Sequence, residues 1–519
     1  AQPKEDAHPN LSAPVVLGGD VVPFSLDADP DDRRVDRLLA CMGALDDAAP
    51  LFGRSAGVHG VGVLLALPAL LESGVLDVAR EIYGSLGPAF YGLRTTVVTL
   101  LLMALLRVRR TEGLKERSPR DLGHVLGLDR APEMKTLRKK LKRLAAAGRA
   151  ASFGRALAQR RVAQRGRAMG FLYVDGHVRV YHGKHALPKA HVARMRISMP
   201  ATTDYWVNDA KGEPLFVVPT EANEGLVAML PPILDEVRRL VGEQRVTVVF
   251  DRGGWSPKLF EKLIKARFDI LTYRKGRVRR VARRLFVLCK ATLDGQKVRY
   301  LLADQGVRFR SGLRLRQVTR LGEDGHQTAI VTSRRDLSAV EVAYRMFSRW
   351  RQENFFKYLR EEYALDALVD YDVEDADTTR EVPNPVRARL DAELRQARTA
   401  FKETLALYGV EAITNAESLR RTMRGFKIAN AQGARLIQAA LKRITDIDRR
   451  RAHVPTRVPL RTARPDEVFK LAVERKHLTN LVKMVAYQAE SDLVRMLAPR
   501  YRRADDEGRT LIQSAIAQA

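Results

Sequence analysis

Three acidic residues, far apart in the chain, have the types and positions needed to share a divalent cation. Asp175 and Asp251 each end a short apolar segment with the character of a buried strand, and Glu353 lies on a predicted helix. Carboxylate oxygens favour Mg²⁺ or Mn²⁺ over zinc. Two such ions about 4 Å apart would hold the attacking and leaving oxygens of a phosphoryl displacement. These residues predict metal-dependent phosphodiester chemistry, although each acid alone could also be a structural carboxylate.

The glutamate belongs to a predicted uninterrupted helix from Ser338 to Tyr363. Ser338 and Glu341 form a capping-box pattern at its start. Helical spacing places one acid, three cations and two apolar residues along one side: Met346, Arg349, Glu353, Phe356, Lys357 and Arg360. An acid working beside phosphates would be surrounded in this way. The alternative is an amphipathic helix with a surface ladder of ion pairs.

The composition predicts a polyanionic partner. The 519 residues include 90 Lys and Arg against 61 Asp and Glu, which gives a net charge of +29. Nucleic acid is favoured over a membrane, because the longest apolar run, residues 95–106, is shorter than the roughly 18–20 residues of a spanning helix. Cys41 and Cys289 have no ligand spacing around them, and no export signal is recognisable. We therefore expect a cytoplasmic, nucleoid-associated protein.

The N-terminal third is predicted to contain a mobile arm over residues 1–35 and an α-helical DNA-binding region over 36–168. Within that region, residues 118–147 resemble a helix-turn-helix with a turn at Gly127. The second helix would enter the major groove. It carries the cations Lys135, Arg138, Lys139 and Lys142. The alternative for this helix is an ordinary solvated basic face.

Strand and helix patterns predict an α+β core over residues 169–365, built on a mixed sheet. A β-subdomain is expected as an insertion at 277–335, since Asp294-Gly295 and Asp324-Gly325 are hairpin signals. Four of its arginines suggest a basic face, although solvated strand edges use such residues too: Arg308, Arg310, Arg314 and Arg316. An acidic linker at 366–385 and an α-helical C-terminal domain at 386–519 complete the prediction.

The block RWRQENFFKYLR, with VDGH and FDRGGWS upstream, resembles the DDE transposases of bacterial insertion sequences. The resemblance covers residues 171–363, in the branch with a Tyr-Arg-Glu-Lys signature. It implies an RNase H-like core in which Asp175, Asp251 and Glu353 bind two Mg²⁺ or Mn²⁺ ions. Arg349 matches the signature arginine. Met346 stands where tyrosine is usual, and Arg360 replaces the lysine while keeping its charge.

The resemblance implies cleavage at the ends of a mobile element, followed by transfer of the 3′-OH ends into target DNA by a homodimer. Arg349, Lys357 and Arg360 would contact the double-stranded DNA. Trp255 and Trp350 would stack on an unpaired base, or they close a core instead. Two alternatives stay open: a non-catalytic or decayed DNA-binding protein, and a nuclease of the same fold without strand transfer.

Overall fold

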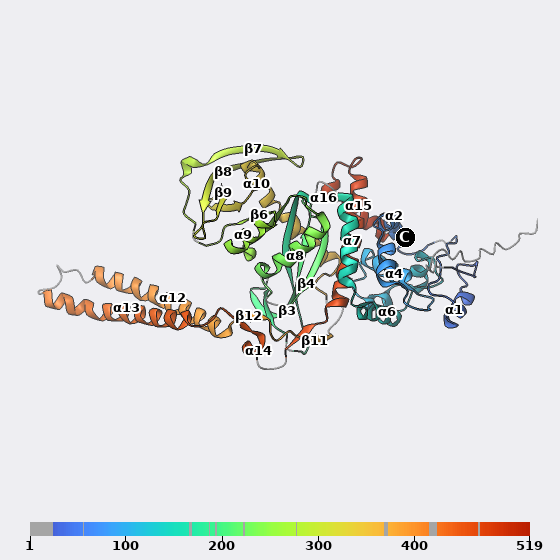
Figure 1. The fold of residues 1–519 in the computed structure, drawn as a ribbon, viewed down its shortest axis with the longest axis horizontal. Helices are drawn as coiled ribbons and strands as arrows, with labels where there is room; N and C mark the ends of the chain where they lie inside the picture. Colours follow the sequence, from blue (N-terminus) through green and yellow to red (C-terminus); the bar gives the residue numbers. More distant parts are fainter. Residues whose placement is uncertain are drawn as a thin grey trace, which may run out of the picture. The chain divides into compact units, whose positions relative to one another are not determined.

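The computed structural model describes residues 24–518 except 55–56, 166–168, 186, 193–194, 222–223, 277, 368–371, 415–422 and 465–467. It divides into two compact units (Figure 1). The first combines Ala1–Gly183, Ala190–Asp372 and Leu471–Ala519, and the second combines Lys184–Lys189 and Val373–Lys470. The predicted C-terminal domain at 386–519 is therefore split, because its last two helices belong to the first unit.

A large mixed sheet dominates the first unit, in agreement with the predicted α+β class. Within the described residues it has ten strands, in the order β2-β3-β1-β5-β6-β10-β9-β8-β7, with β4 paired to β3. The strands are β1 (Phe171–Val180), β2 (Lys189–Val192), β3 (Ile197–Asn208), β4 (Pro214–Thr220), β5 (Val246–Phe250), β6 (Phe268–Tyr273), β7 (Val287–Leu293), β8 (Gln296–Arg308), β9 (Arg314–Leu321) and β10 (Gln327–Thr332).

The centre of the sheet is parallel and its two flanks are antiparallel. β5 runs parallel to both β1 and β6, and all five of its residues are buried. A strand covered on both faces is expected to be continuously apolar, as the segment VTVVF is. β1 also pairs antiparallel with β3, and β3 with β4. The covering helices that follow in the chain are α8 (Leu226–Val241), α9 (Pro257–Lys265), α10 (Ala339–Phe347) and α11 (Trp350–Glu362).

The predicted β-insertion extends this sheet and is not a separate subdomain. Both hairpins form as expected, and Asp294 and Gly295 have the positive φ angles that a tight hairpin turn requires. β10 then pairs antiparallel with β6, with Val331 opposite Thr272. The backbone ladder therefore continues from the core into the hairpins, although the first predicted insertion residue, Arg277, lies outside the described residues.

The N-terminal region is helical, as predicted. Its helices are α1 (Arg34–Cys41), the 3-10 helix η1 (Val61–Ala66), α2 (Leu67–Glu72), α3 (Val75–Tyr83), α4 (Leu93–Leu105), the 3-10 helix η2 (Thr111–Glu116), α5 (Pro119–Val125), α6 (Met134–Ala146) and α7 (Ala150–Arg165). Among the described residues, no single helix could cross a membrane by length and apolarity, whereas one bent pair, Val61–Glu72 with Val75–Tyr83, meets both criteria together.

Part of the predicted mobile arm is packed against this helical region. Residues 1–23 lie outside the described part of the chain, but Arg33 is buried and forms an ion pair with Asp36. The Arg33 guanidinium also donates a hydrogen bond to the carbonyl of Gly127, 3.1 Å away. The prediction was wrong for this segment, because the arginine anchors it to the turn between α5 and α6.

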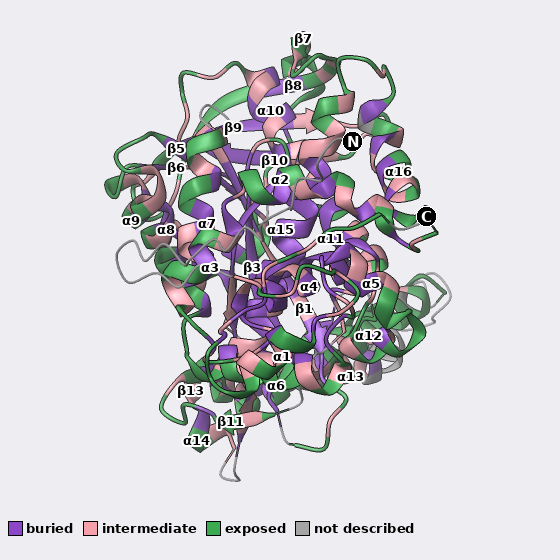
Figure 2. Ribbon diagram, turned by 90° about the vertical axis from the view of Figure 1, so that its right-hand side faces the viewer, coloured by how far each residue is buried: buried purple, intermediate pink, exposed green. Residues whose placement is uncertain are grey.

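The helix α15 (Val473–Leu497) forms the centre of the first unit, followed by α16 (Ala504–Ala517). α15 packs against β4, α16 and N-terminal helices, namely η1, α2, α4, α6 and α7. Figure 2 shows its buried surface, and nearly every residue from Lys476 to Ser491 is buried. A helix buried on all sides is normally apolar. Because α15 carries charged residues inside, it needs internal partners for them.

The second unit contains a long helical hairpin, as predicted. It is formed by α12 (Pro385–Thr414) and α13 (Met423–Ala452), with Leu394, Ala397 and Ile447 buried between them. The remaining elements are β11 (Val373–Asp375), β12 (Glu381–Pro383), β13 (Arg457–Pro459), α14 (Leu460–Ala463) and β14 (Phe469–Leu471). The predicted linker at 366–385 thus forms two short strands; its residues 368–371 lie outside the described part.

Asp204 on β3 is the main internal partner of α15. It is fully buried and forms ion pairs with Arg179 on β1 and with Lys476 on α15, and it accepts a hydrogen bond from Asn480. Burial alone would raise the pKa of Asp204, but the two cations hold it well below its usual value. The sheet and α15 are therefore joined by an ionised cluster with little solvent around it.

Replacing Asp204→Asn should lower the free energy of unfolding by about 3–5 kcal/mol, because two buried cations lose their counter-charge. Urea denaturation of the full chain measures the change. The matched control is Glu243→Gln, which breaks an ion pair with Arg267 whose side chains are 77% and 79% exposed. That variant should stay within about 0.5 kcal/mol of the parent protein. Equal effects from both changes would contradict the proposed role of the cluster.

Lys483 on α15 should make the free energy of unfolding depend on pH in the alkaline range. Its ammonium donates to the carbonyl of Ala364, 2.9 Å away, and burial lowers its pKa to about 7. Between pH 7 and the unfolded pKa of 10.5, the unfolded chain binds more protons, so stability should rise with pH in this window. Lys483→Met should flatten that rise, as measured by unfolding free energies across the window. An unchanged slope would show that the ammonium is not desolvated.

Candidate active site

The parallel pairing of β1 and β5 brings two of the predicted acids to the same level of the sheet. Val174 lies opposite Phe250, and the next residues in the two strands are Asp175 and Asp251. Asp175 does not end its strand, as the sequence suggested, because β1 continues to Val180 along β3. The parallel pairing of β1 with β5 stops at Val174, so Asp175 is the first β1 residue beyond the end of β5.

Asp251 also organises the loop that follows β5. Its Oδ1 accepts a hydrogen bond from the backbone N–H of Gly253, 2.8 Å away, at the start of the 3-10 helix η4 (Arg252–Gly254). A Cβ atom at Gly253 would lie only 2.8 Å from the same oxygen, so glycine permits this close approach. The backbone carbonyl of Asp251 accepts from the Thr272 hydroxyl on β6. The carboxylate is thereby held at the edge of the sheet.

The single predicted helix from Ser338 to Tyr363 is two helices, α10 and α11, separated at Ser348 and Arg349. Ser338 caps α10 as predicted by accepting from the N–H of Glu341. Ser348 is buried, and its hydroxyl donates to the Tyr344 carbonyl, 2.8 Å away. Such a bond can bend a helix, although Ser491 makes the same bond to Tyr487 inside the uninterrupted helix α15.

The break places Glu353 in the first turn of α11. Its side chain is exposed, and the positive end of the helix dipole favours a carboxylate there. The preceding residue, Gln352, is buried, and its amide donates to the carbonyls of Tyr173 and Trp206 and to Oδ1 of Asn208. This amide fastens the start of α11 to β1 and β3, beside Asp175.

Arg349 lies among all three acids. Its guanidinium donates to Oδ2 of Asp175, 2.9 Å away, and both side chains are largely buried. Burial would lower the pKa of Arg349, but the carboxylates of Asp175, Asp251 and Glu353 raise it. Burial raises the pKa of Asp175, and the Asp251 charge adds to this effect while Arg349 opposes it. The arginine therefore offsets repulsion within an acidic cluster.

In the described part of the chain, no three His, Cys, Asp or Glu side chains are arranged closely enough to enclose a metal ion. The oxygen-only donor set suits a hard cation. In the geometry observed, the Arg349 guanidinium provides the positive charge beside Asp175. The three acids thus share Arg349 as a charged neighbour, and the described residues do not form a closed coordination shell.

The other predicted contact residues differ in their surroundings. Trp255 packs edge-on against Phe260 and Phe309, with ring centroids 5.3 and 5.8 Å away. Trp350 is 48% exposed, as a base-stacking residue would need to be. Lys357 is exposed, and Arg360 is half-buried. Met346, at the tyrosine position of the signature, is fully buried on the core-facing side of α10.

The helix-turn-helix candidate has the predicted local structure. α5 is capped by Ser118, Gly127 has a positive φ in the turn, and α6 buries its leucine stripe. The four predicted DNA-contacting residues of α6 are all exposed: Lys135, Arg138, Lys139 and Lys142. Arg138 forms an ion pair with Glu112, which leaves the other three as the more available cations.

Sequence reasoning missed three residues around the site. Gln352 was not predicted, because the helical pattern of polar and apolar residues does not distinguish a buried amide from a solvent-exposed one. Gly176 lies opposite Tyr205, and a Cβ atom there would come within 2.9 Å of the tyrosine ring. Tyr273 at the end of β6 has a raised pKa, mainly through burial, with Arg349 and Glu353 among its charged neighbours. A glycine inside a strand is the only one of these signals visible in the sequence.

Gln352→Met should destabilise the protein by roughly 1–2 kcal/mol, because buried oxygens of β1 and β3 lose the two N–H groups of this amide. Asn354→Ala, at an exposed position on the same helix, is the control and should change stability by less than about 0.5 kcal/mol. Chemical denaturation measures both. If Gln352→Met is as stable as the control, the amide does not hold α11 on the sheet.

Comparison with protein families gives a match over nearly the whole chain. A family model described as "Transposase protein" matches residues 31–518. A search of curated proteins finds no match. Among solved structures, the cryo-EM structure of the piggyBac transposase synaptic complex with hairpin DNA is similar at 10% identity and a TM-score of 0.31, covering 88% of this chain and 86% of that one.

Proposed function

We propose that this chain, which belongs to the transposase family matched over residues 31–518, is a DDE-type DNA transposase with Asp175, Asp251 and Glu353 as its catalytic acids. The observation that carries the proposal is the ion pair between Arg349 and Asp175, 2.9 Å long, which brings the start of α11 beside β1. Asp251 follows β5 at the level of Asp175, and Glu353 lies one helical turn after Arg349. The mixed sheet, with its parallel centre and antiparallel flank, supports an RNase H-like core of the insertion-sequence type.

The donor chemistry fits two Mg²⁺ or Mn²⁺ ions held by Asp175, Asp251 and Glu353. Bound there, the ions would activate water and stabilise charge on the phosphate oxygens during cleavage at element ends and transfer of the 3′-OH ends to target DNA. Arg349 would orient the Asp175 carboxylate and offset repulsion among the acids.

Double-stranded DNA is the proposed partner, as terminal repeats and as target. Lys357, Arg360 and Trp350 on α11 would contact it beside the acids, and α6 would contribute Lys135, Arg138, Lys139 and Lys142 in a groove. A net charge of +29 supports strong attraction to the phosphate backbone. Assembly as a homodimer on DNA and a cytoplasmic, nucleoid-associated location belong to the same proposal.

The test is a cleavage assay with the full chain, DNA carrying the element ends, and Mg²⁺. The wild type should give nicked and joined products, and Asp251→Asn and Glu353→Gln should give none while DNA retention is unchanged. Glu361→Gln removes an exposed carboxylate from the same helix and should cleave like the wild type. Wild-type activity in Asp251→Asn would overturn the catalytic assignment.

A second candidate, a DNA-binding protein without catalysis, is favoured by the open arrangement of acids in the described residues and by Met346 at the signature tyrosine position. It predicts salt-sensitive DNA retention and no metal-dependent nicking. A third candidate is a nuclease of the same fold without strand transfer. A target-capture assay distinguishes it from a transposase, because such a nuclease would cut the donor DNA without joining it to the target DNA.

A further inference from the structure

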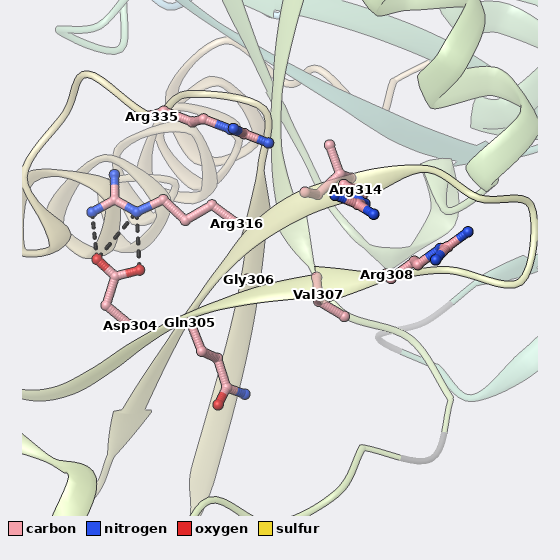
Figure 3. Close-up of a pocket in the computed structure, with 9 residues that line it drawn as sticks. Asp304, Gln305, Gly306, Val307, Arg308, Arg314, Arg316 and Arg335 are labelled. Carbon is pink, nitrogen blue, oxygen red and sulfur yellow. Dashed lines mark hydrogen bonds and ion pairs between the residues drawn. The ribbon is translucent and has the colours of Figure 1, made fainter.

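The two strands β8 and β9 border an open hollow that the proposed catalytic chemistry does not use (Figure 3). Its volume is about 690 Å³. Four arginines line it, Arg308, Arg314, Arg316 and Arg335, together with a single acid, Asp304. The hollow therefore combines a strong positive charge with wide access from solvent.

Only one of these arginines has its charge balanced. Figure 3 shows Arg316 turned toward Asp304, and its guanidinium donates to both carboxylate oxygens at distances of 2.6 to 3.2 Å. Arg308, Arg314 and Arg335 are exposed and form no ion pair with any residue in the described part of the chain. Three guanidinium groups are therefore available to an external anion.

The register makes this arrangement unfavourable without an anion. Arg308 and Arg314 are directly opposite each other in the antiparallel ladder of β8 and β9. Like charges at such positions destabilise a sheet, whereas opposite charges stabilise it. A bound anion would offset this repulsion between Arg308 and Arg314.

We propose that this hollow binds backbone phosphates of duplex DNA, as a contact separate from the acidic cluster. The proposal rests on the transposase function above, for which DNA is the anionic partner. Guanidinium groups form paired hydrogen bonds with phosphate oxygens, so arginine suits the site better than lysine. A small-molecule site would enclose most of its ligand, whereas this hollow is open, as a passing polymer requires.

The hairpin tip connects the hollow to the candidate active site. Phe309 follows Arg308, and its ring packs against Trp255, which lies in the loop after Asp251. The Arg274 guanidinium stands over the same Phe309 ring, 5.7 Å from its centroid, and also bonds to Gln317 on β9. DNA engaged at Asp251 would therefore pass close to a hairpin whose end carries unpaired arginines.

The double variant Arg308→Gln/Arg314→Gln tests this inference. Duplex DNA binding is measured by fluorescence anisotropy over a series of salt concentrations. Loss of two phosphate contacts should reduce the slope of log affinity against log salt by about 1.8 and weaken binding about tenfold or more. The thermal midpoint should stay the same or rise, because the cross-strand repulsion is removed.

Lys290→Gln/Arg299→Gln is the matched control. These residues are also exposed cations directly opposite each other, on β7 and β8, but neither lines the hollow. The control removes the same charge and should leave the affinity within about twofold and the salt slope nearly unchanged. Equal losses in the two double variants would overturn the inference, since general attraction to a basic surface would then explain both.

The cleavage assay separates failure of this inference from failure of the proposed function. If the wild type nicks DNA but the hollow variant keeps its salt slope, the hollow is not a DNA contact and the transposase assignment stands. If neither the wild type nor any variant shows metal-dependent nicking, the catalytic assignment fails. The DNA contact still stands if Arg308→Gln/Arg314→Gln, and not the control, reduces the slope of log affinity against log salt. Tighter binding of duplex RNA of the same sequence, with the same loss in the variant, would overturn the choice of DNA.

Discussion

The parallel register of β1 and β5 is the constraint on which the candidate site depends. Because Val174 faces Phe250, the two following aspartates lie at the same level, and a shift of one residue would turn one carboxylate to the opposite face of the sheet. β5 itself is buried along its whole length, which holds it at the centre of the sheet. α11 then needs only to be fastened beside β1, which Gln352 achieves, for Glu353 to join the same electrostatic neighbourhood.

The charges inside the first unit follow a similar logic. Glu490 of α15 is fully buried and is balanced by Arg107, by Arg509 and by the Tyr358 hydroxyl of α11. Asp204 plays the corresponding part between α15 and the sheet. Breaking such pairs is costly because one charge is left without a partner in a poorly solvated interior. The helix α11 is thus held from the sheet side and from the α15 side, which limits how far Glu353 can move.

Much of the local structure could be predicted from the sequence, because it depends on local signals. The turn at Asp294-Gly295, the cap at Ser338 and the leucine stripe of α6 all follow from residue preferences that act over a few positions. Features that depend on distant partners could not be predicted. The break at Ser348, the packing of Arg33 and the burial of α15 each require contacts that a one-dimensional pattern does not contain.

The sign of the local excess charge distinguishes two regions of the first unit, the surroundings of Asp175 and the hollow between β8 and β9. Around Asp175, a single arginine serves several carboxylates, so the local excess is negative and suits a cation. Between β8 and β9, a single carboxylate serves several arginines, so the local excess is positive and suits a phosphate. A DNA strand that is cut with the help of a metal ion carries negative phosphates both at the cleaved bond and along the flanking backbone. The cleaved phosphate needs the metal ion held by the acids, and the flanking phosphates need cationic side chains, so both regions must be within reach of one strand. The packing of Phe309 on Trp255 provides the physical link between them.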